Sequence, residues 1–251
     1  MRHINLKKSS LIVLASLLSI SGCKELQPIL DTAGQIAQQS QQTTPSQVDT
    51  QTAIKQALSQ GIDKSIQQLG TNGGFSSGAF RIPLPGDLQK LGQQARDLGL
   101  GRYVDDFEMS MNRAAEKAVP IAKDAFKASI QQMTLNDVVS IMRGSDNAAT
   151  QYFERTMRPT LTQRFLPIVA RSTDAVGVTK EYKDFASKVS FYATAAGINM
   201  PSNADLDQYV TQKATDALFT KVADVEKSIR QDPWGQASAL IRQVFGYYRN
   251  N

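Results

Sequence analysis

The spacing of apolar residues is helical along nearly all of the chain after residue 47. One stripe recurs every three or four residues and ends at Gly70, which predicts a first helix on the pattern of a buried face; its members are Ala53, Ile54, Ala57, Leu58, Ile62, Ile66 and Leu69. No stretch of alternating β-branched residues predicts a strand. The pattern therefore predicts an all-α fold, a single multi-helix bundle.

Breaks in the pattern divide the rest of the chain into further helices. A long helical segment over residues 103–133 contains Pro120, which should kink or split it because proline lacks a backbone donor. Thr134 with Asp137 predicts the start of the next helix, and Asp146 predicts the start of another. Later helices are predicted to start at Thr179, at Asp205 and near Ala237.

Residues 70–86 lack the helical spacing and contain two prolines that hold Ile82 and Leu84 extended. A loop of this length inside a compact domain is usually functional or disordered, and its apolar residues argue against disorder. Two interpretations remain open, since the loop can pack across the bundle or form a partner surface. The residues concerned are Phe75, Phe80, Arg81, Ile82 and Leu84.

The N-terminus has the layout of an export signal. A short basic region precedes a mostly apolar run over residues 11–20, which is too short to span a bilayer because a crossing helix needs about 20 residues. Residues 20–23 resemble a bacterial lipobox, which implies cleavage before Cys23 and acylation of its sulfur. We therefore expect residues 1–22 to be a lipoprotein signal peptide. The alternative is an ordinary signal peptide followed by a chance cysteine.

The segment after the cleavage site is rich in Gln, Ser and Thr, so residues 23–47 are expected to form the lipidated N-terminus and a flexible tether. An alternative is a short amphipathic turn over residues 26–33. The helical domain is expected over residues 48–251. Lys24, by resemblance to Gram-negative sorting rules, points to the outer membrane.

Composition excludes several classes of site. His3 and Cys23 are the only histidine and cysteine, so a processed chain has no histidine and no free thiol for a catalytic triad, a disulfide or a His/Cys zinc site. Removing residues 1–22 takes away three of 28 bases and no acid, which leaves 25 bases against 23 acids. This balance does not support nucleic-acid binding. No cofactor motif is present, and we expect no metal.

Two groups of side chains are weak candidates for a site. Asn112, Arg113 and Glu116 lie within about one helical turn and either bind a ligand or form a solvated face. A lone Glu116 or Glu154 would be the acid of a murein-acting hydrolase. Aromatic residues at helical spacing are either core or the lining of a cavity for an apolar ligand; they are Tyr152, Phe153, Phe165, Tyr182, Phe185, Phe191 and Tyr192.

Several segments together resemble the bacterial domain-of-unknown-function family 4197. The resemblance runs from about Ala53 to Gly246 and is carried by residues 73–75, 81–85, 111–116, 148–153, 164–167 and 205–210. It implies a helical, exported domain whose biochemical role is unassigned.

These observations favour a membrane-anchored periplasmic lipoprotein that acts as a non-enzymatic binding or interaction module of the cell envelope. Its expected partners are the membrane, through acylated Cys23, and an envelope protein. The alternatives are a lipid-binding protein and a murein-acting hydrolase.

Overall fold

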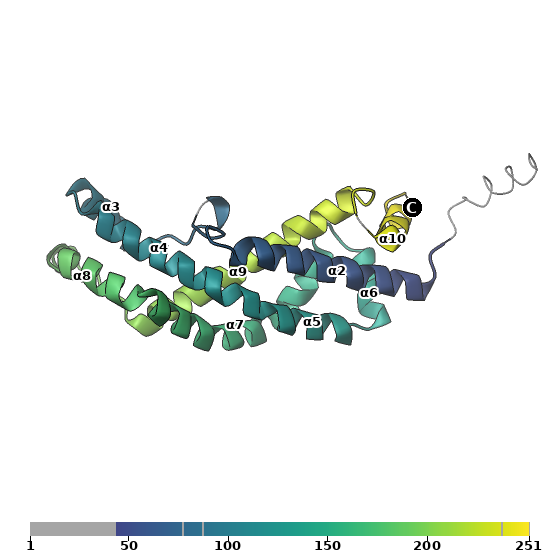
Figure 1. Cartoon of the computed structure of the whole chain (residues 1–251), viewed down its shortest axis with the longest axis horizontal. Helices are drawn as coiled ribbons and strands as arrows, with labels where there is room; N and C mark the ends of the chain where they lie inside the picture. Colours follow the sequence, from purple (N-terminus) through teal and green to yellow (C-terminus); the bar gives the residue numbers. More distant parts are fainter. Residues whose placement is uncertain (1–43, 77, 87, 237, 251) are drawn as a thin grey trace, which may run out of the picture. The chain divides into compact units, whose positions relative to one another are not determined.

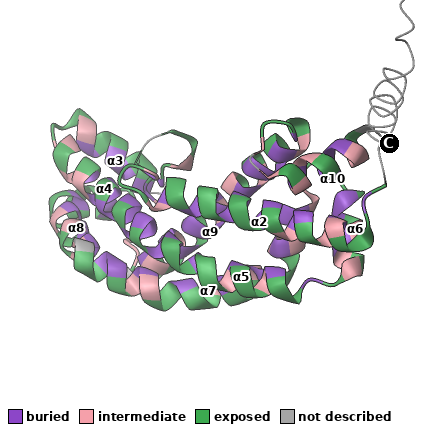
Figure 2. Cartoon of the chain, turned by 45° about the vertical axis from the view of Figure 1, so that its right-hand side comes forward, coloured by how far each residue is buried: buried purple, intermediate pink, exposed green. Residues whose placement is uncertain are grey.

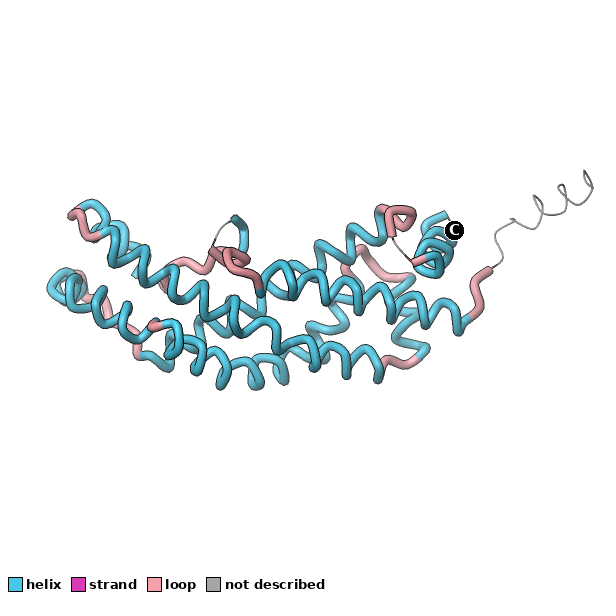
Figure 3. The backbone as a smooth tube through the Cα atoms, in the orientation of Figure 1, coloured by secondary structure: helices cyan, strands magenta, loops and turns pink. Residues whose placement is uncertain are grey.

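Helices joined by short turns make up the described part of the computed structural model, which comprises residues 44–76, 78–86, 88–236 and 238–250 (Figure 3). These residues contain no strand, so the all-α prediction is confirmed. None of their helices is both long and apolar enough to cross a membrane. The expected signal peptide, Cys23 and most of the tether lie outside the described residues.

Apart from the longer loop over residues 71–87, the helices follow one another with few intervening residues (Figure 1). They are α2 (Gln47–Gly70), α3 (Leu88–Asp97), α4 (Gly101–Ala118), α5 (Ala122–Gln132), α6 (Leu135–Met142), α7 (Ala148–Val176), α8 (Val178–Ala195), α9 (Asn203–Gln231) and α10 (Ala239–Asn250). Two 3-10 turns, η1 (Gly78–Phe80) and η2 (Val119–Ile121), complete the set. The compact unit that they form begins at Pro45.

Three of the predicted helix boundaries are confirmed. α2 ends at Gly70, as its apolar stripe predicts. Pro120 lies in η2, which separates α4 from α5. Thr134 is the N-cap of α6, and it exchanges hydrogen bonds with Asp137 in a capping box. In contrast, α7 continues through Pro159 and Pro167 without a break.

Three predicted helix starts are wrong by a few residues. Asn147, not Asp146, precedes α7, and α8 begins directly after Gly177 rather than at Thr179. Gly177 has φ of 81°, which ends α7 in a left-handed turn and starts α8 in the same residue. Asp205 lies in the first turn of α9, where it completes a capping box with the N-cap Ser202.

The core lies between long helices that run side by side. α7 contacts both α4 and α9, α2 contacts α5 and α9, and α8 packs on α4 (Figure 2). Fully buried phenylalanines fill the space between them, including Phe107, Phe126, Phe153, Phe165 and Phe185. α3 and α8 meet at one end of the bundle, whereas α6 and α10 pack on α2 at the other (Figure 1).

Candidate functional site

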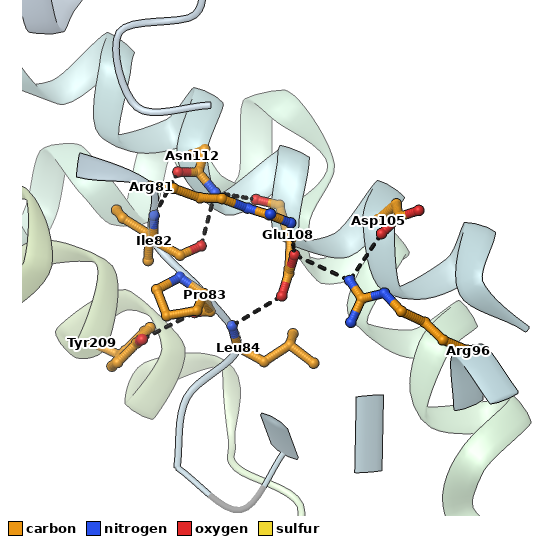
Figure 4. Close-up of polar contacts among 9 residues, drawn as sticks. All are labelled: Arg81, Ile82, Pro83, Leu84, Arg96, Asp105, Glu108, Asn112 and Tyr209. Atoms are coloured by element: carbon orange, nitrogen blue, oxygen red, sulfur yellow. Dashed lines mark hydrogen bonds and ion pairs between the residues drawn. The ribbon is translucent and has the colours of Figure 1, made fainter. Parts of the chain in front are cut away.

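One face of α4 carries three buried polar side chains, each one helical turn from the next. Glu108, Asn112 and Glu116 are 6%, 1% and 5% exposed, and all three bind the loop between α2 and α3. Figure 4 shows Glu108 and Asn112. Their i, i+4, i+8 spacing aligns them along one row of the helix. We call this row the α4 polar row.

Asn112 holds the middle of the loop through both ends of its amide. Its Oδ1 accepts the Ile82 N–H at 2.8 Å, and its Nδ2 donates to the Ile82 carbonyl at 2.9 Å. The same Nδ2 also donates to the Glu108 carbonyl within α4. The side chain therefore satisfies the backbone of an extended residue as a neighbouring strand would.

Glu116 holds the start of the loop. Its Oε1 accepts from the N–H groups of Gly73 and Phe75 at 3.0 and 3.2 Å, and from the Ser76 hydroxyl at 3.1 Å. Hydrogen bonds to a carboxylate are stronger than those to a neutral oxygen because the acceptor is charged. This carboxylate is thus engaged in fixing the turn after α2.

Glu108 holds the end of the loop and joins it to α3. Its Oε1 accepts the Leu84 N–H at 3.3 Å, and its Oε2 pairs with the guanidinium groups of Arg81 and Arg96. Tyr209 of α9 donates its hydroxyl to the Pro83 carbonyl at 2.9 Å (Figure 4). Burial, and then the charge of Glu108, raise the pKa of Tyr209 to about 12, so the phenol remains a donor at neutral pH.

These contacts hold the apolar residues of the loop in the core. Phe75, Ile82 and Leu84 are at most 1% exposed, so they pack across the bundle, which is one of the two interpretations left open by the sequence. Phe80 is partly buried under the ammonium group of Lys221, and Arg81 is paired with Glu108. Ala79, Arg81 and Pro83 of the same loop are exposed, so the partner surface stays a prediction for this part of the loop.

The three ligand candidates on α4 also differ in burial. Asn112 and Glu116 are brought together as expected, but the loop backbone occupies their polar atoms. Arg113 lies on the exposed side of the helix. The three residues therefore form no open ligand site.

A second buried polar cluster joins three helices. Glu226 of α9 accepts from the Ala149 and Thr150 N–H groups at the start of α7, both at 2.9 Å, and from the Thr150 hydroxyl. Arg230 pairs with Glu226 at 2.9 Å and donates to the Ile141 carbonyl at the end of α6. The negative charge of Glu226 thus lies at the amino end of α7, and the positive charge of Arg230 lies at the carboxyl end of α6, as the helix dipoles favour.

Glu154 and most of the aromatic candidates pair or pack within the bundle. Glu154 pairs with Arg158 of its own helix, at the surface. Phe153, Phe165, Tyr182 and Phe185 lie in the core, and Tyr152 is half-buried. The described residues hold no group of three His, Cys, Asp or Glu side chains placed to bind a metal.

Three exposed apolar side chains lie where the ends of α3 and α8 meet. Phe191 is 77% exposed, Leu98 is 52% exposed and Tyr192 is 40% exposed. Leu98 and Tyr192 line an open groove of about 450 Å³ together with Gln94, Asp97, Ala195 and Ala196. We call this surface the α3–α8 groove.

The sequence indicates Phe191 and Tyr192 only as core or as the lining of a cavity, and Leu98 is not predicted to be part of a site. The signal for Leu98 is its position directly before Gly99, where α3 has already ended. An apolar residue in such a turn is not held to the core by helical periodicity.

Comparison with known families adds one finding. The family model described as a protein of unknown function, DUF4197, matches residues 44–246, which include the α4 polar row, the Glu226 cluster and the α3–α8 groove. Neither a search of curated proteins nor a search of solved structures found a match to this chain. The chain belongs to the DUF4197 family of proteins of unknown function.

Proposed function

We propose that the chain is a lipoprotein of the cell envelope, anchored to the outer membrane through acylated Cys23 and facing the periplasm, where its helical domain acts as a non-enzymatic interaction module. The observation that carries the interaction role is the α3–α8 groove. Contiguous exposed apolar surface rimmed by polar residues is typical of sites that bind other molecules.

The groove indicates the chemistry of its partner. Its apolar part, Leu98 and Tyr192 with the neighbouring Phe191, suits apolar side chains of another protein. Asp97 adds a carboxylate at the rim, where a lysine or arginine of the partner would meet it. We therefore expect an envelope protein that presents an apolar segment beside a basic residue.

The geometry gives less support to lipid carriage. A cavity lined by Ile54, Leu58 and Phe245, between α2, α9 and α10, holds only about 20 Å³. Sites for drug-sized ligands hold roughly 300 to 1,000 Å³, so this cavity is too small for an acyl chain. The α3–α8 groove has a volume in this range, but it is open to solvent and does not enclose a chain.

Murein hydrolysis by a lone glutamate is also less well supported. The Glu116 carboxylate already accepts three hydrogen bonds from the loop, and Glu154 is paired with Arg158. A general acid must instead face the substrate with a proton to give.

The interaction role is tested by photo-crosslinking in cells. A photoreactive amino acid at Phe191 is expected to give a discrete crosslinked protein, and the additional change Leu98→Asp should remove that product because it places a charge in the groove. The control position is Gln208, which is exposed on α9. No product at Phe191, or the same product from Gln208, would contradict the role of the groove.

The anchor is tested separately. Material from the native host is expected to begin at Cys23 and to carry a diacylglyceryl adduct in intact-mass analysis. Cys23→Ser should release the chain from the membrane fraction, because two or three acyl chains give stable anchoring and their loss leaves none. Unchanged fractionation of this variant would refute lipidation.

A further inference from the structure

Trp234 is the only tryptophan of the chain, and its side chain is 66% exposed. It lies in the turn between α9 and α10, next to the buried Pro233. A large aromatic side chain in this degree of contact with solvent is unusual in a folded domain, because its burial would remove much apolar area from water. Its exposure therefore calls for a role outside the core.

The turn that carries Trp234 is held by hydrogen bonds on both sides. The Asp232 carboxylate accepts the Gly235 N–H at 3.0 Å, and the Gln236 amide donates to the Asp232 carbonyl at 2.9 Å. Arg249 of α10 donates to the Gln231 carbonyl at 2.6 Å. The indole is thus presented from a fixed backbone.

One part of the indole is covered by α10. A Cβ atom on Gly246 would lie only 3.2 Å from Cζ2 of Trp234, which shows that the ring rests on this glycine. Tyr247 and Tyr248 follow in the same helix, with their rings 5.4 Å apart and edge to face. Two aromatic residues and Arg249 therefore follow directly after the glycine on which the indole rests.

This surface lies beside the point where the chain enters the bundle. Phe245 of α10 lines a cavity with Ile54 and Leu58, in the N-terminal half of α2, and the Ser238 hydroxyl donates to the Gln56 side chain at 3.2 Å. Residues 24–46 connect the first turn of α2 to Cys23. As a flexible tether, these residues would span roughly 25 to 30 Å on average, so an anchor at Cys23 brings this end of the bundle within reach of a bilayer.

Tryptophan, tyrosine and arginine are the side chains that proteins place at the membrane–water interface, because each combines an apolar body with a polar group. Asp232 accepts the Gly235 N–H and keeps its negative charge, and Arg249, which donates to the carbonyl of the adjacent Gln231, supplies a positive charge in the same region. We propose that the Trp234 turn, with Arg249, rests on the phospholipid surface to which Cys23 is anchored. This inference rests on the lipoprotein function proposed above.

The consequence concerns orientation. The Trp234 turn follows α9 and precedes α10, and α10 packs on α2 at the end of the bundle opposite to the meeting point of α3 and α8 (Figures 1 and 3). Contact between Trp234 and lipid directs the α3–α8 groove away from the bilayer, toward partners in the periplasm.

The chain itself supplies the probes for a test, because it has one cysteine and one tryptophan. The polypeptide from Cys23 to Asn251, which contains the whole compact unit, is coupled through Cys23 to maleimide lipid in vesicles of phosphatidylethanolamine and phosphatidylglycerol. With lipids brominated on the acyl chains, Trp234 emission is expected to fall roughly twofold relative to unlabelled vesicles, since an interfacial indole contacts those chains.

The matched control is Trp234→Phe with Phe191→Trp, which moves the reporter to an equally exposed site on α8. Its emission should be the same in vesicles with and without brominated lipids. Quenching at neither position, or equal quenching at both, would overturn the proposed orientation. Because this chain is coupled chemically, the outcome does not depend on acylation in cells, so a failure here is distinguishable from a missing adduct on Cys23.

Discussion

Replacing Glu226 with alanine is expected to lower the free energy of unfolding by about 3 to 5 kcal/mol, the range for breaking a buried ion pair. Arg230 would keep its charge at 12% side-chain exposure without its counterion. The Ala149 and Thr150 N–H groups would also lose their acceptor at the start of α7. Urea denaturation followed by circular dichroism measures the loss.

Glu154→Ala is the matched control, because Glu154 also pairs with an arginine one turn away but lies at the surface. Its expected cost is about 0 to 1 kcal/mol. The double change Glu226→Ala with Arg230→Met should lower the free energy of unfolding less than Glu226→Ala alone, since it also removes the unpaired charge of Arg230. Equal losses for Glu226→Ala and Glu154→Ala would show that the cluster does not stabilise the fold as described.

Asn112→Asp is expected to destabilise the chain by about 2 to 3 kcal/mol, which corresponds to buried polar groups left without partners. The new carboxylate can still accept the Ile82 N–H, but it cannot donate to the carbonyls of Ile82 and Glu108. It would also stand one turn from Glu108 in a buried row. The loop over residues 81–84 should then detach from α4 before the bundle unfolds.

Hydrogen exchange gives the specific readout for this prediction. The Ile82 and Leu84 amides, which donate to the α4 polar row, should exchange faster in Asn112→Asp, whereas core amides of α7 should change much less. Arg113→Ala, at the exposed neighbouring position, is the control and should leave both unchanged. Unaltered exchange of the Ile82 amide would contradict the role of Asn112 in holding the loop on α4.

Much of the helical layout is predictable because its determinants are local. The stripe that ends at Gly70, the interruption at Pro120 and the capping box at Thr134 all depend on residues within a few positions of one another. α3 is missed although its buried residues follow the helical spacing, because it has only ten residues and carries Gly92 in its middle. Pro159 and Pro167 do not end α7, because its packing against α4 and α9 outweighs the loss of two backbone donors.

The polar contacts are less predictable because their partners are distant in sequence. Glu108, Asn112 and Glu116 follow a spacing that fits a solvated face equally well, and their burial becomes apparent only when the loop is placed on them. Their apolar neighbours Phe107 and Met111 offered a signal, since a polar row beside a core stripe is often partly buried. Nothing near Glu226 in the sequence points to Ala149.

The link between Glu226 and α7 also sets an order of events during synthesis. The side chain that satisfies the first turn of α7 lies 77 residues downstream of Ala149. At typical rates of chain elongation those residues take roughly 4 to 15 s to make. Throughout that interval the first turn of α7 lacks its carboxylate acceptor and α7 lacks α9 as a packing partner, so this part of the bundle can be completed only after α9 has been made.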